Sequence, residues 1–156
     1  MKRFTIIFTT LLVLAFAGTL LYVSMSPDFQ PPNSFVGEGE DPDSPVWDMT
    51  LEDLLSALEE QGLIDRSDEQ VTAFSGVSSD GRKVSGAEFY WWDLENLDED
   101  SDEMVAYQSM KSEGIIDLWN SGYLMSVTGN GPFGVNLSQY TGDVSKLEQA
   151  FKEFGR

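Results

Sequence analysis

The chain of 156 residues has 27 acidic and 9 basic residues, a formal net charge of −18, and neither cysteine nor histidine. Without cysteine it cannot form disulfides, thiol nucleophiles or Cys-ligated metal sites. Without histidine it lacks the usual general base and the commonest zinc ligand, so we expect no metal and no cofactor. The acidic charge repels phosphate backbones, which excludes nucleic acid as an expected partner.

An uncharged apolar run extends from Phe4 to Val23. As a helix, such a run of about twenty residues spans the hydrocarbon core of a bilayer. Because Lys2 and Arg3 precede it, the N-terminus is expected in the cytoplasm and the rest of the chain outside the cell membrane. The run is longer than the apolar part of most signal peptides, which favours an uncleaved single-pass anchor over residues 1–25. The alternative is a signal peptide cleaved after Ala17, which would give a secreted protein.

Residues 26–46 are predicted to be a linker because they hold five of the six prolines, several acids and no base. Proline removes backbone donors and like charges repel, so this segment is expected to be extended. The remaining residues, 47–156, have a common size for one domain and are predicted to form a single extracytoplasmic domain.

Three helices are predicted in this domain from caps and apolar spacing. The first follows Thr50 and ends at Gly62. The second runs from about Asp102 to Glu113, between Ser101 and Gly114. The third runs from about Val144 to Phe154, after Asp143.

Four strands are predicted at 71–77, 86–94, 123–128 and 133–138, with turns at 79–81 and 129–132. The sequence after the first helix, Gln61 to Asp65, resembles the sequence after the second, Glu113 to Asp117, which favours a duplicated unit over two similar helix ends. We therefore predict an α+β fold of order α-β-β-α-β-β-α. Its four-stranded, mainly antiparallel sheet would carry the helices on one face and follow one N-terminal transmembrane helix.

The aromatic strand at 86–94 contains the candidate ligand site. Aromatic rings and carboxylates are the groups that bind sugars or quaternary amines. Strand alternation puts Ala87, Phe89 and Trp91 on one face and the intervening residues on the other. An exposed ring would indicate binding, whereas rings covered by helices would be core. The candidate ligand-binding residues are Glu88, Tyr90, Trp91, Trp92 and Asp93.

Catalysis and metal binding have weaker signals. Asp98, Asp100 and Asp102 alternate as calcium ligands do, but Glu103 and Ser109 stand where that loop needs glycine and glutamate. No catalytic residue is assigned, and no metal site. The sequence thus favours a membrane-anchored binding module for a protein or a cell-envelope component. The alternative is a hydrolase that acts on glycans with carboxylates alone.

Overall fold

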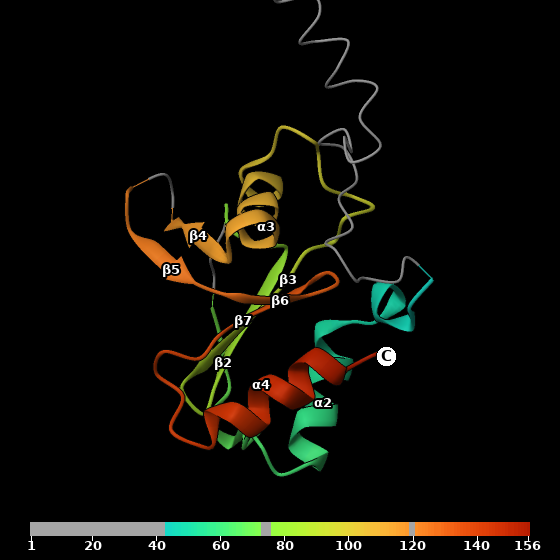
Figure 1. Ribbon diagram of the computed structural model, residues 1–156, viewed down its shortest axis with the longest axis vertical. Helices are drawn as coiled ribbons and strands as arrows, with labels where there is room; N and C mark the ends of the chain where they lie inside the picture. The colour runs from blue at the N-terminus through green and yellow to red at the C-terminus, as the bar shows by residue number, and fades with distance from the viewer. Residues whose placement is uncertain (1–42, 73–75, 119–120) are drawn as a thin grey trace, which may run out of the picture. The chain divides into compact units, whose positions relative to one another are not determined.

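The computed structural model describes residues 43–72, 76–118 and 121–156. These residues form an antiparallel five-stranded sheet of order β1-β2-β3-β7-β6 and an antiparallel pair, β4-β5 (Figure 1). The strands are β1 (Gln70–Val71), β2 (Asp80–Val84), β3 (Ala87–Trp91), β4 (Ile115–Asp117), β5 (Leu124–Ser126), β6 (Thr128–Asn130) and β7 (Phe133–Asn136). The helices are α2 (Leu51–Glu60), α3 (Asp102–Glu113) and α4 (Val144–Glu153), with 3₁₀ turns η1 (Pro45–Asp48) and η2 (Arg66–Asp68).

The predicted anchor at 1–25 and the linker up to residue 42 lie outside the described residues. Within the described ranges, no helix is both long and apolar enough to cross a membrane. The predicted linker extended to residue 46, but its last residues belong to the folded domain. Ser44 donates its hydroxyl to the carbonyl oxygen of Gly155 at 2.7 Å, and Val46 is only 4% exposed.

The predicted helix caps are confirmed. Thr50 and Asp53 form a reciprocal capping box at the start of α2, and Ser101 and Asp143 accept backbone bonds at the starts of α3 and α4. Gly62 and Gly114 follow α2 and α3 with φ of 67° and 68°, the left-handed conformation that favours glycine. Local sequence therefore determines where these helices begin and end.

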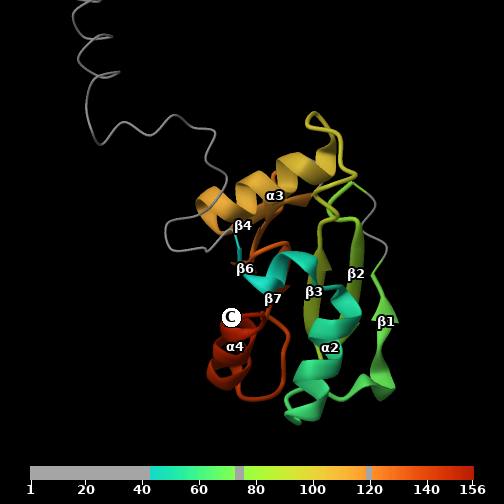
Figure 2. The same ribbon diagram turned by 90° about the vertical axis from the view of Figure 1, so that its right-hand side faces the viewer.

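The helices cover both faces of the sheet, so the prediction that they pack on one face is wrong. On one face, α2 and α4 pack over Phe89 and Val135; on the other, α3 packs over Tyr90 and Trp92 (Figures 1 and 2). The physical reason is that β3 is apolar on both sides: Phe89 and Tyr90 are each fully buried. A sheet with two apolar faces needs a cover on each.

The strand count also differs from the predicted four. The turn predicted at 79–81 overlaps the start of β2, whose remaining residues had no predicted element, and β4 was expected only as the apolar residues that follow the second helix. The polar strand forms because β2 pairs with β1 on one side and β3 on the other, and its charges also have partners: Arg82 lies 3.2 Å from Glu69, and Lys83 lies 3.7 Å from Glu88. Of the strand predicted at 71–77, the described residues keep only Val71, in β1.

The two segments with similar sequence do not form a symmetric pair. Each consists of a helix followed by strands, and β3 of the first lies beside β7 of the second. A two-fold axis that exchanges these antiparallel neighbours runs perpendicular to the sheet, and it would leave both helices on one face. Since α2 and α3 lie on opposite faces, the likeness reduces to similar helix ends.

Candidate functional site

Two of the five predicted site residues, Tyr90 and Trp92, are fully buried beneath α3. The indole Nε1 of Trp92 donates to the carbonyl oxygen of Val77 at 2.8 Å, and the Tyr90 hydroxyl donates to Glu88 at 2.9 Å. Their rings lie 6.1 Å apart, centroid to centroid, and pack within the core. Neither ring offers a free face on which a ligand could stack.

The other predicted residues lie apart from this pair. Trp91 is on the opposite face of the sheet, half-buried against the core that α2 and α4 cover. Asp93 follows β3 and accepts two hydrogen bonds from the side chain of Asn96, at 3.0 and 2.9 Å. The predicted alternation of faces is therefore confirmed, and it separates Trp91 from Tyr90 and Trp92. Tyr90 contacts both Glu88 and Trp92, but its ring and that of Trp92 are buried in the core.

The contact between Glu88 and Tyr90 affects protonation. Burial raises the pKa of the Tyr90 phenol above its ordinary value, and the adjacent Glu88 carboxylate raises it further. The ammonium of Lys83 lies 3.7 Å from the other side of Glu88 and donates to Gln139 at 2.8 Å. This row of polar side chains joins β2, β3 and the loop after β7, so its evident role is to hold the sheet together.

A different site arises where β5 and β6 meet. These strands are consecutive and bend at Val127, whose N–H donates to the carbonyl oxygen of Gly114 at 2.9 Å. After the bend, Thr128 pairs with Val135 of β7; before it, Ser126 pairs with Ile115 of β4. Because β5 turns to the second sheet, β7 has no strand of the described residues beside it on the β6 side beyond Val135, while its other side stays paired with β3. We call the opening between Ser126 and Leu137 the fork.

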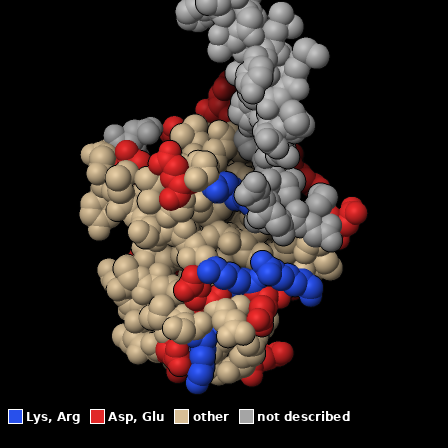
Figure 3. Space-filling view, in the orientation of Figure 1, with Lys and Arg blue, Asp and Glu red and all other residues tan. Residues whose placement is uncertain are grey.

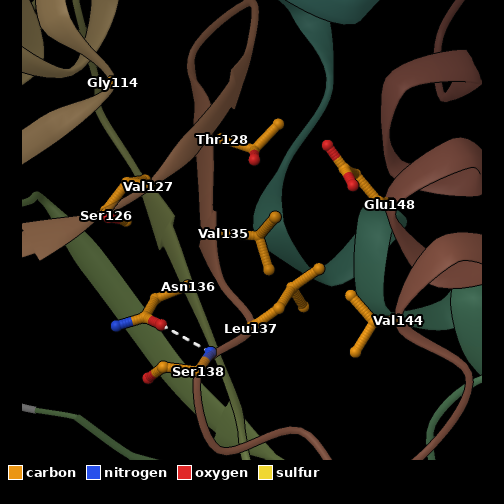
Figure 4. Close-up of a pocket in the computed structure, with 10 residues that line it drawn as sticks. All are labelled: Gly114, Ser126, Val127, Thr128, Val135, Asn136, Leu137, Ser138, Val144 and Glu148. Carbon is orange, nitrogen blue, oxygen red and sulfur yellow. Dashed lines mark hydrogen bonds between the residues drawn. The ribbon is translucent and has the colours of Figure 1, made fainter.

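The fork contains a pocket of about 390 Å³, the fork pocket (Figure 4). Thr128 and Glu148 face each other across it from β6 and α4, and the aliphatic side chains of Val135, Leu137 and Val144 lie below them in this view. Polar groups complete the wall, and the Asn136 side-chain oxygen accepts from the Ser138 N–H at 2.8 Å. The lining residues are Gly114, Ser126, Val127, Thr128, Val135, Asn136, Leu137, Ser138, Val144 and Glu148.

The helix side of the fork pocket is positioned by the start of α4. Asp143 caps this helix, which brings Val144, at 43% exposure, and Glu148, one turn later, to the pocket. Glu148 accepts from the ammonium of Lys152 at 2.7 Å. This ion pair is solvent-exposed and therefore weak, so the carboxylate remains accessible to another cation.

The described lining combines aliphatic and neutral polar side chains with one carboxylate. Among the described residues that line the fork pocket, only Glu148 is ionisable, so the pocket offers no acid and base pair of the kind that hydrolyses glycosides. The described part of the chain also contains no group of three acidic side chains placed to hold a metal ion. An aliphatic floor with a polar rim is typical of a site that holds a ligand by shape and a few hydrogen bonds.

Sequence reasoning missed this site because no local signal marks it. Its residues come from the end of α3, from β5, β6 and β7, and from α4. The fork depends on where the chain stops pairing with β7 and begins to pair with β4. That position is determined by the tertiary structure and not by a local sequence motif. The Gly-Asn-Gly-Pro segment at 129–132 was predicted as a turn, whereas only Gly131 and Pro132 turn and the two residues before them belong to β6.

Comparison with known protein families, with curated proteins and with solved structures gives no match to this chain.

Proposed function

We propose that this protein is a membrane-anchored binding module whose domain lies outside the cell membrane and holds a protein or cell-envelope component in the fork pocket. The observation that carries the proposal is the loss of β7's partner on the β6 side beyond Val135, beside an aliphatic pocket of about 390 Å³. Such a combination of open strand edge and apolar pocket favours ligands that contribute backbone and side chain together. The location rests on the apolar run and its basic flank.

The charge of the protein supports a ligand that is neutral or basic. The net charge is −18, and acidic side chains are spread over the face seen in Figure 3, with basic groups next to acidic ones. A surface of this kind attracts cations and disfavours polyanions. The partner is therefore sought among proteins and neutral or cationic envelope components, not among nucleic acids.

The alternative, a glycan hydrolase that uses carboxylates alone, has less support. Of the two carboxylates among the candidate ligand-binding residues, Glu88 already contacts Tyr90 and Lys83, and Asp93 is held by Asn96. Asp93 lies beyond the end of β3 and has different partners from Glu88, so the two do not form an acid and base pair. The fork pocket therefore favours a protein that binds its ligand without converting it.

Selection of ligands on the full-length protein in mild detergent tests the proposal. We would select from a displayed library of random linear peptides, and screen a panel of cell-wall glycans in parallel. The informative variant is Val144→Glu, because a glutamate in the first turn of α4 is compatible with the helix but charges the pocket wall. Its matched control is Val71→Glu, the same change at an exposed valine of β1.

We expect ligands whose affinity falls at least about tenfold with Val144→Glu, through the burial of a charge against an apolar group, and stays unchanged with Val71→Glu. Ligands that bind both variants as well as the natural sequence would place binding elsewhere. The absence of any selected peptide or bound glycan would overturn the proposed function. Release of reducing sugar from a bound glycan would instead establish the hydrolase.

A further inference from the structure

The open edge of β7 directs backbone groups into the fork. Every residue of β7 pairs with β3, but the N–H of Trp92 donates to the carbonyl oxygen of Pro132, so by alternation the even-numbered residues are those that hydrogen-bond to β3. Val135 is odd-numbered, so its backbone groups are directed to the other side of the strand, where it pairs with Thr128 of β6. Leu137 follows the last residue of β7, and the same alternation, continued one residue past the strand, directs its N–H away from β3 and toward the fork. Its carbonyl oxygen accepts from the Tyr140 N–H at 3.1 Å, which leaves the N–H of Leu137 as the group directed at a ligand.

The opposite side of the fork presents backbone groups in the same way. Hydrogen bonds from Val127 to Gly114 and from Leu118 to Tyr123 define which residues of this hairpin bond across it. Ser126 lies between those rungs, so its N–H and C=O point away from β4. If β6 had continued straight, Ser126 would have paired with Leu137. The fork is therefore the place where the pairing of Ser126 with Leu137 is missing, and the backbone groups of both residues are directed toward it.

From this geometry we propose that the ligand is an extended segment of a partner protein that adds a strand beside β7 at Leu137. This inference rests on the proposed function and specifies its ligand. The Leu137 N–H donates to a carbonyl oxygen of the segment, as in other strand additions. Every second side chain of the segment then meets the floor formed by Val135, Leu137 and Val144, so an aliphatic residue belongs there.

Charge complementarity selects a basic segment. The chain as a whole is strongly acidic, and Glu148 is the charged member of the described pocket lining. Its present partner, Lys152, is half exposed and can turn to solvent. A lysine or arginine of the ligand therefore takes a position beside Glu148, one or two residues from the aliphatic side chain. An acidic segment would meet repulsion from Glu148 and from the overall field.

Synthetic copies of peptides selected on the full-length protein from the random linear library test this inference. Each backbone amide of a selected peptide is methylated in turn, which removes one donor and hinders strand pairing. We expect alternate positions to lose about tenfold in affinity and the positions between them to change little, because a strand directs its amides to either side in turn. Peptides that need Val144 but tolerate methylation everywhere would keep the proposed function and overturn strand addition.

The charge is tested with Glu148→Gln, with Glu153→Gln on the same helix as the control. We expect selected peptides to be rich in lysine or arginine, and to lose affinity about fivefold with the first variant and not with the second. Replacing the basic residue of the peptide by glutamine should remove that difference. Selection of acidic or uncharged peptides would contradict the proposal that the segment is basic. A second copy of this chain would be identified as the occupant, against our proposal, by a dimer in sedimentation that Val144→Glu dissociates.

Discussion

The side-chain amide of Asn130 donates to the carbonyl oxygen of Phe154 at 3.0 Å. The same nitrogen donates to the carbonyl oxygen of Phe151 at 2.7 Å. These carbonyls lie at the end of α4, where the only further backbone donor to either from the described residues is the Phe154 N–H, which donates to the Phe151 carbonyl at 3.3 Å. One buried side chain of β6 thus completes the C-terminus of a helix and attaches that helix to the edge of the sheet. The fork pocket lies along the same helix and strand.

Asn130→Ala is expected to lower the free energy of unfolding by about 2 kcal/mol, because it removes two side-chain hydrogen bonds and leaves the Phe154 carbonyl without this donor, while the Phe151 carbonyl keeps, within the described part of the chain, only the Phe154 N–H. Urea titration followed by tryptophan fluorescence measures the change. Asn96→Ala is the control, since Asn96 is exposed and donates only to the exposed side of Asp93. Equal losses in the two variants would contradict a special role for Asn130.

Gly86 is expected to be far less replaceable than Gly62. Both have positive φ, 82° and 67°, so alanine strains the backbone at each position by about 1 kcal/mol. A Cβ atom on Gly86 would also lie 2.1 Å from the carbonyl oxygen of Gln139, whereas one on Gly62 meets nothing within 4 Å. We expect Gly86→Ala to destabilise the protein by about 3 kcal/mol or more, or to prevent folding. Similar urea midpoints for the two variants would show that the loop at Gln139 moves readily to make room for the added methyl group.

Stability should fall at alkaline pH because of Tyr90. Its folded-state pKa is raised above the ordinary 10.0, chiefly by burial. A group with a raised pKa contributes its stability fully below the unfolded pKa, and that contribution is lost as the pH rises above it. We therefore expect unfolding free energies to decline above about pH 10, by up to about 1.4 kcal/mol per pH unit for this residue.

Tyr90→Phe should flatten this decline, and Tyr123→Phe, at an exposed position, should not. Part of the alkaline loss will persist in the first variant, since burial and the nearby Asp143 also raise the pKa of Tyr140. Urea titrations at a series of pH values between about 8 and 11 give the slopes. A slope unchanged by Tyr90→Phe would contradict the assignment.

Acidic pH should reveal the ion pairs of Arg66. This residue binds both carboxylate oxygens of Glu52, at 2.6 and 2.9 Å, and Glu69 at 2.7 Å. The hydrogen bond from Arg66 lowers the pKa of Glu52. A lowered pKa gives stability that is present above the unfolded value of 4.5 and is lost as the pH falls below it.

Arg66→Gln should therefore lower the melting temperature near pH 7, and the difference from the natural sequence should shrink below about pH 4.5 and in high salt. Lys146→Gln removes the same charge from a mostly exposed pair with Asp143, so it serves as the control. A difference that persists in acid would indicate that Arg66 acts through packing alone.

The parts of the fold that were predicted correctly depend on local interactions. Thr50, Ser101 and Asp143 cap helices through bonds to residues three positions later, and such bonds can be read from spacing. The strand β2 could not be predicted in this way. Its stability comes from partners distant in sequence, such as Glu69 for Arg82, and its polar composition resembles a turn.

The candidate site shows the same contrast more sharply. The pattern at 86–94 correctly placed Tyr90 and Trp92 on one face of a strand, but no local pattern states that α3 covers that face. Likewise Leu137 and Ser126 have ordinary neighbours in the sequence. They become important because the chain pairs with β7 in β6 but with β4 in β5. This change of partner depends on the tertiary structure.

The bend at Val127 has a mechanical consequence. A single stretch of chain, from Leu124 to Asn130, belongs to both sheets, so the small sheet has no hinge that is independent of the large one. Tension on the exposed tip at Tyr123 would be transmitted along that stretch to the rung between Thr128 and Val135. The fork pocket is lined by residues on both sides of the bend, Ser126 of β5 and Thr128 of β6, so we expect a ligand held there to restrict movement of the small sheet relative to the large one.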